Sequence, residues 1–211
     1  MSDSMKNFTT DVNRKAREHG ITVYKGRGKT VKCPGDGVPV SGYFDEENLK
    51  LAVATGDSDW VGTFAHEASH MDQFLEDSEY WTDDLTEAYE VLMLATASPL
   101  KVSKEEFKEA LNTIVMLEAD CERRTIEKIK QHNLPVDLED YTRKANAYLY
   151  WHTSMLYYRK WYARGKSPTK VGVTSIMPTT LQEPEHYRID EHHVPYTTFA
   201  ACYPKNIKVW N

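Results

Sequence analysis

The spacing of hydrophobic positions along the chain predicts a small sheet followed by a run of helices. Residues 21–54 contain short apolar runs separated by turn-forming residues, which is typical of strands. Residues 58–163 instead place apolar side chains three and four positions apart, which is typical of helices. The expected strands cover 21–24, 38–44 and 49–54, and the expected helices cover 6–18, 60–75, 84–97, 104–132 and 138–163. This order predicts an α+β fold with a small N-terminal β-sheet and a mainly helical remainder.

Local signals place several of the helix ends. Ser103 and Glu106 have the spacing of a capping box at the start of the fourth helix, and Gly165 is the expected stop of the fifth. After Gly165 the periodicity is lost, and five of the nine prolines lie there. The Tyr, Ile and Trp residues of this segment are too apolar for free disorder. We therefore expect one domain over residues 1–165, with an irregular segment, 166–211, packed on it.

Composition narrows the class of protein. The chain has 211 residues, of which 40% are hydrophobic and 27% are charged, as in soluble globular proteins. Its net charge of −6 argues against a nucleic-acid partner, and no apolar run approaches the roughly 18 residues that span a bilayer. The polar N-terminus shows no secretory signal, and the odd number of cysteines, three, argues against a disulfide framework. We expect a cytoplasmic protein with reduced thiols.

The most informative motif is the run from His66 to His70, which has the pattern H-E-x-x-H. Positions i and i+4 of a helix lie on one face, so both imidazoles can reach a single Zn²⁺. Glu67, next to His66, can act as the general base on a metal-activated water. In the expected helix the two histidines lie at the border of the apolar face, where the floor of a cleft would be.

A catalytic zinc site needs a third protein ligand, and the helix over 104–132 offers one. Glu118 lies in the middle of the apolar stripe of that helix and Glu122 lies beside it, whereas Asp120 falls on the opposite, solvent side. A buried carboxylate is costly unless it is paired or bound to a metal. Glu118 is therefore the expected third ligand, and Glu122, one turn later, is expected to hydrogen-bond a ligand histidine. The stripe consists of Phe107, Leu111, Ile114, Cys121, Thr125 and Ile129.

An H-E-x-x-H helix followed by a glutamate on a later helix resembles the gluzincin metallopeptidases. The downstream signature of that family is often Glu-x-x-x-Asp, and the matching stretch here is Glu118-Ala119-Asp120-Cys121-Glu122, with Glu where Asp is usual. The resemblance covers roughly residues 50–130 and extends to small phage- or bacterium-encoded proteins. It implies a zincin-like fold, a Zn²⁺ cofactor held by His66, His70 and Glu118, and hydrolysis of peptide bonds.

Several alternatives stay open at this point. A metzincin would need a glycine where this chain has Gln73 and a third histidine where it has Glu76. Without that glycine, the sharp turn that brings in the third ligand is hard to make. Glu122 or Glu90 could be the ligand instead of Glu118. Both acids of the fourth helix could also form buried salt bridges, with Arg123, Arg124 or Arg143 as the available partners.

Other candidate residues have both a functional and a structural interpretation. Tyr148 and His152 share a face of the fifth helix and could stabilise an oxyanion, although a core histidine in an aromatic stripe is the more common case. Cys121 could bind metal as a thiolate or be a small buried apolar residue. His186, His192 and His193 could form a secondary metal site or be solvated surface histidines.

The sequence thus predicts a zinc-dependent metallopeptidase that acts on a peptide or protein substrate. The expected strand 49–54 could be an edge strand that pairs with an extended substrate. Two other classes remain: a non-catalytic binding protein stabilised by metal in a degenerate zincin site, and a metal-free interaction module that uses its aromatic helix.

Overall fold

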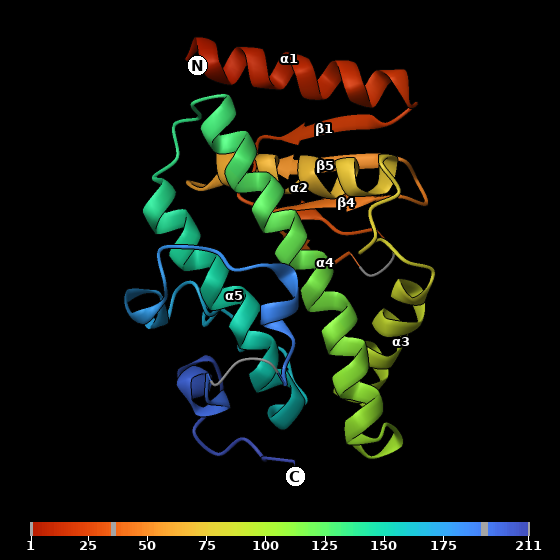
Figure 1. Ribbon diagram of the computed structural model, residues 1–211, viewed down its shortest axis with the longest axis vertical. Helices are drawn as coiled ribbons and strands as arrows, with labels where there is room; N and C mark the ends of the chain where they lie inside the picture. The colour runs from red at the N-terminus through yellow and green to blue at the C-terminus, as the bar shows by residue number, and fades with distance from the viewer. Residues whose placement is uncertain (1, 35–36, 191–193, 211) are drawn as a thin grey trace. The chain divides into compact units, whose positions relative to one another are not determined.

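The computed structural model describes residues 2–34, 37–190 and 194–210 and confirms the α+β fold. The chain forms two compact units. The first comprises residues 1–78 and 121–138, and the second comprises 79–120 and 139–211. The long helix α4 (Lys104–Gln131) contributes its first part to the second unit and its last part to the first (Figure 1).

The first unit is built on a three-stranded sheet with the order β1-β5-β4. Strand β5 (Lys50–Ala54) pairs in parallel with β1 (Thr22–Gly26) and antiparallel with β4 (Gly42–Asp45). A separate antiparallel pair joins β2 (Val31–Lys32) to β3 (Pro39–Val40). The expected strand 38–44 is therefore two strands, β3 and β4, which belong to different sheets.

The expectation that residues 49–54 form an edge strand is wrong, because β5 is the central strand. All four residues from Leu51 to Ala54 are buried, so neither face of this stretch is solvated. A strand that is covered on both faces needs apolar residues at every position, and alanine meets this requirement where space is small. The two edge strands of this sheet are β1 and β4, which flank β5.

Two helices pack on this sheet. Helix α1 (Asp3–Glu18) buries Met5, Phe8, Val12 and Ala16, a stripe with helical spacing. Helix α2 (Trp60–Leu75), whose bounds agree with the expected 60–75, packs on β4 and β5. The ring centroids of Phe8 and Phe64 are 5.3 Å apart, which joins the two helices in one core.

The second unit combines helix α3 (Asp84–Ala97), the first part of α4 and helix α5 (Leu138–Tyr158). The expected capping box is present: Glu106 N–H donates to Ser103 Oγ over 3.1 Å, and Ser103 N–H donates to Glu106 Oε2 over 3.3 Å. Helix α5 ends at Tyr158, five residues before the expected end. Arg159 has a φ of 49°, and its guanidinium donates to the Pro99 and Val102 carbonyls, so a tertiary contact ends the helix before Gly165.

The C-terminal segment contributes to the core of the second unit. Its described residues form only short 3₁₀ turns, yet Tyr187 and Phe199 are fully buried there. Tyr187 Oη donates to Asn146 Oδ1 on α5 over 2.6 Å. These turns are η2 (Val173–Ile176), η3 (Pro184–Tyr187) and η4 (Tyr196–Cys202), and a further 3₁₀ turn, η1 (Pro99–Lys101), follows α3. In the part of the chain that the structure covers, no helix has the length and apolar character required to cross a bilayer.

Candidate metal site on the H-E-x-x-H helix

Helix α2 places His66 and His70 on successive turns of one face. Their ring centroids are 4.7 Å apart and their planes are nearly perpendicular, at 89°. Cys121 of α4 completes a group in which one ligand atom from each residue lies within 4.8 Å of the others. Two imidazoles and a thiol are ligands that Zn²⁺ accepts, so the donor chemistry of this group fits a zinc ion.

The Nδ1 atom of each histidine lies next to a side-chain oxygen. His70 Nδ1 is 2.9 Å from Gln73 Oε1, and His66 Nδ1 is 3.3 Å from Glu122 Oε1. An oxygen acceptor at Nδ1 holds the proton on that nitrogen, which leaves Nε2 as the lone-pair donor. This is the arrangement by which proteins orient metal-binding histidines. Each imidazole therefore has a neighbouring side-chain oxygen that can orient it as a metal ligand.

Cys121 is fully buried and lies close to His66. Its Sγ is 3.5 Å from His66 Nδ1 and donates a hydrogen bond to the His66 backbone carbonyl over 3.3 Å. The thiol thus has polar contacts on α2 rather than the purely apolar surroundings of a small core residue. In the sequence, this contact is indicated only by the position of Cys121 on the same apolar stripe as Glu118.

Electrostatics at His66 favour positive charge. Burial alone lowers the pKa of this imidazole, but interactions with the neighbouring Cys121 and Glu122 side chains outweigh burial and raise the pKa well above its ordinary value. A pocket that stabilises a proton on a buried imidazole also stabilises a bound cation in its place.

Glu67 lies beneath the edge strand. It is buried, and a methyl group placed on Gly42 of β4 would come within 2.9 Å of its Cγ. Only glycine therefore allows β4 to approach this part of α2 so closely. The Glu67 side chain consequently lies next to β4, one of the two edge strands of the sheet.

The C-terminal half of α2 is anchored to α4 and α1 by polar contacts. Thr125 Oγ1 donates to Ser69 Oγ over 3.0 Å in the interior. The Asp72 carboxylate lies 2.6 Å from both Lys15 of α1 and Lys128 of α4, and its side chain is only 14% exposed. These contacts hold the register between α2 and the part of α4 that carries Cys121 and Glu122.

The other predicted site residues belong to the second unit. Glu118, Tyr148 and His152 lie there, so the roles of Glu118 as ligand and of the other two as oxyanion donors stay predictions. His152 is buried and its Nδ1 contacts the Tyr148 and Leu149 carbonyls, as expected of a core histidine. Burial lowers its pKa despite the opposing charge of Glu118.

The exposure of two further acidic residues, Asp120 and Glu90, bears on the predicted site. Asp120 was expected on the solvent side of α4, but it is only 1% exposed, because α4 is covered on more than one side. Glu90, an alternative ligand, is exposed on α3.

Each of the basic residues proposed as salt-bridge partners has an acidic neighbour. Arg124 pairs with Glu76 over 2.7 Å, and Arg143 pairs with Glu139 over 3.1 Å. Arg123 lies 3.3 Å from Glu127.

The histidines of the C-terminal segment do not form a site that the structure describes. His186 is exposed and lies against the Tyr150 ring, with centroids 6.4 Å apart. His192 and His193 fall outside the described residues.

Comparison with protein-family models, with curated proteins and with solved structures finds no match for this chain. Functional inference therefore depends on the chemistry and geometry of the residues themselves.

Proposed function

We propose that the protein is a zinc-dependent metallopeptidase. The proposal rests on one observation: the Nδ1 atom of each motif histidine lies next to a side-chain oxygen, from Gln73 in one case and from Glu122 in the other. Two such histidines at H-E-x-x-H spacing, with a third donor within reach, are what a catalytic zinc site requires.

His66 and His70 would hold the ion together with a third residue. Cys121 lies within the cluster, and Glu118 is the ligand expected from the family resemblance. When bound, zinc would supply a Lewis acid that polarises a carbonyl and lowers the pKa of water. In this interpretation Glu122 and Gln73 orient the imidazoles and keep the proton on Nδ1.

Glu67 would accept the proton of the attacking water. It is adjacent to a ligand histidine in sequence and lies next to β4 in space. A carboxylate there would pass this proton on to the amine that leaves. Tyr148 and His152 remain the candidates for the donor that stabilises the oxyanion.

The edge strand suggests how a peptide would be held. An extended peptide can add to the free edge of a sheet through backbone hydrogen bonds. Here that edge is β4 rather than residues 49–54, and Gly42 of β4 contacts the helix that carries Glu67. A peptide paired with β4 would therefore pass near the motif.

The second candidate is a non-catalytic protein stabilised by metal. It is favoured by one observation, the buried thiol of Cys121, because thiolate ligands are frequent in closed structural zinc sites. In such a protein Glu122 would complete a four-ligand set and Glu67 would have no chemical role.

The Glu67→Gln variant separates these two functions. We expect a peptide library treated with the zinc-loaded protein to show cleavage by mass spectrometry, with the rate reduced at least about a hundredfold in Glu67→Gln while zinc is retained. Glu79→Gln, an exposed glutamate, is the matched control. Zinc binding without any cleavage by the unaltered protein would favour the metal-stabilised binding protein.

A further inference from the structure

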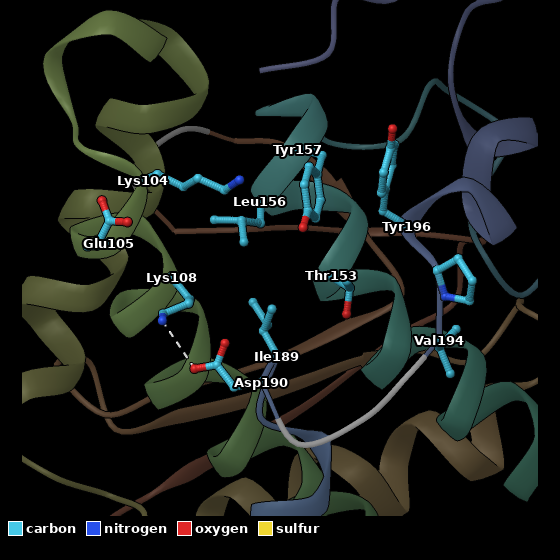
Figure 2. A pocket seen from close by; sticks show the side chains of 11 residues that line it. Lys104, Glu105, Lys108, Thr153, Leu156, Tyr157, Ile189, Asp190, Val194 and Tyr196 are labelled. Atoms are coloured by element: carbon cyan, nitrogen blue, oxygen red, sulfur yellow. Dashed lines mark ion pairs between the residues drawn. The ribbon is translucent and has the colours of Figure 1, made fainter. Parts of the chain in front are cut away.

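The second unit contains a cavity of about 460 Å³ that the proposed peptidase function does not use. It lies between the start of α4, the end of α5 and the C-terminal segment (Figure 2). Its volume is within the range of small-molecule sites in proteins. Its apolar lining comes from Leu156, Ile189, Val194 and Pro195.

The two lysines that line this cavity have different partners. Lys108 Nζ is paired with Asp190 over 3.1 Å, so these two charges neutralise each other. Lys104 Nζ instead lies 4.6 Å from the centre of the Tyr157 ring. Figure 2 shows the Lys104 side chain reaching toward Tyr157, while the Glu105 carboxylate lies on the α4 side of the group. A contact with an aromatic face leaves the N–H donors of an ammonium available for an anion.

The two tyrosines of the cavity differ in where their hydroxyls point. Tyr157 and Tyr196 stack with ring centroids 4.2 Å apart and an interplanar angle of 19°. In Figure 2 the hydroxyl of Tyr157 points toward Thr153 at the centre of the group, whereas that of Tyr196 points away. The backbone N–H of Trp210 donates to the backbone carbonyl of Tyr157 over 2.8 Å, which helps to fix the position of Tyr157. Lys104 and Tyr157 thus present an ammonium and a hydroxyl beside an apolar lining.

We propose that this cavity binds a small organic carboxylate that carries an apolar group. The carboxylate would pair with Lys104 Nζ and accept a hydrogen bond from Tyr157 Oη, and the apolar group would contact Leu156 and Ile189. Charge-assisted hydrogen bonds of this kind are the strong ones in proteins. The nearby carboxylate of Glu105 disfavours a dianion such as phosphate more than a monoanion.

Two acids distinguish the possible sources of such a carboxylate. We would titrate the full chain with 3-phenylpropionate, a free aryl acid, and with N-acetyl-L-phenylalanine, which mimics a peptide C-terminus, and follow the isotope-labelled protein by NMR. The neutral amide of each acid is the matched control. We expect an acid to shift the resonances of the cavity residues in the millimolar range or below, and its amide to bind about tenfold more weakly. Tighter binding of one of the two acids shows whether the carboxylate belongs to a free acid or to the C-terminus of a peptide.

Four variants test the contacts. Lys104→Met should weaken acid binding about tenfold and Tyr157→Phe a few-fold, because each removes one partner of the carboxylate. Lys101→Met makes the same charge change outside the cavity, and Tyr196→Phe removes the hydroxyl that points away, so both should bind as the unaltered protein does. Equal binding of acid and amide by the unaltered protein, no shifts at millimolar acid, or equal losses in the controls would overturn the proposal.

Discussion

Replacement of Gly42 by alanine tests the close contact between β4 and the motif helix. The added methyl group would lie 2.7 Å from Thr63 Cγ2, 2.9 Å from Glu67 Cγ and 3.0 Å from the Ala52 carbonyl oxygen. Ordinary van der Waals contacts are about 3.5–4.0 Å, so all three distances are too short. The Ala52 oxygen belongs to the central strand and cannot move without disturbing the ladder between β4 and β5.

The expected cost is that of overpacking an interior, about 1–3 kcal/mol in the free energy of unfolding. The assay is hydrogen exchange of the β5 amides, because these lie in the unit that carries the substitution. Every 1.4 kcal/mol lost corresponds to about tenfold faster exchange through the unfolded state. The same displacement of Glu67 should lower any peptidase activity.

Gly28→Ala is the matched control for this substitution. At the exposed Gly28 the nearest atom to an added methyl group is the Thr30 carbonyl oxygen at 3.3 Å, which needs a shift of only a few tenths of an ångström, so the loss of stability should be clearly smaller than in Gly42→Ala. If Gly42→Ala left β5 exchange and global stability unchanged, the contact between β4 and Glu67 would not be as close as described.

Three further predictions concern other parts of the chain. Because burial lowers the pKa of His152 below its ordinary 6.5, the unfolded chain binds the extra proton first as pH falls, so this residue costs stability below about pH 6.5. His152→Gln should reduce the loss of the urea midpoint between pH 7.5 and 5.5, and an unchanged loss would contradict this. Burial raises the pKa of Cys202 to about 11, so a thiol reagent at pH 8 should modify the half-buried Cys33 well before Cys202, which peptide mapping can measure. Ser103→Ala removes one half of the capping box and should cost about 1 kcal/mol in urea unfolding, whereas no change would show that Glu106 alone suffices.

The helices were largely predictable from the sequence because their signals are local. Helix α2 spans the expected residues, and the capping box at Ser103 marks the start of α4. The end of α5 was not predictable, because Arg159 stops it through hydrogen bonds to Pro99 and Val102, which are remote in sequence. A tertiary contact of this kind leaves no mark in the periodicity.

The sheet was less predictable because strand pairing depends on distant segments. The central position of β5 follows from its parallel pairing with residues 22–26, and Ala52 and Ala54 carry too little hydrophobic signal to reveal a strand that is buried on both faces. A sequence pattern alone therefore could not separate a central strand from an edge strand here.

The candidate site was predictable in part. The H-E-x-x-H spacing identified the histidine pair, and Glu122 was expected to contact a ligand histidine, as its 3.3 Å distance to His66 allows. From the sequence no role in the site is predicted for Gln73, although its position three residues after His70 on one helix places it beside that imidazole. The contact of Cys121 with His66 was not predictable, because a thiol on an apolar stripe has the pattern of a core residue.

The most direct test of the central claim is to measure zinc content together with the X-ray absorption spectrum of the zinc-loaded protein. The account predicts about one zinc per chain with nitrogen ligands near 2.0 Å, and a sulfur ligand near 2.3 Å if Cys121 is the third ligand. The zinc should be lost in His66→Ala and in His70→Ala, and Cys121→Ser and Glu118→Gln should show which third residue binds. A protein that binds no zinc, or that keeps it in both histidine variants, would contradict the account.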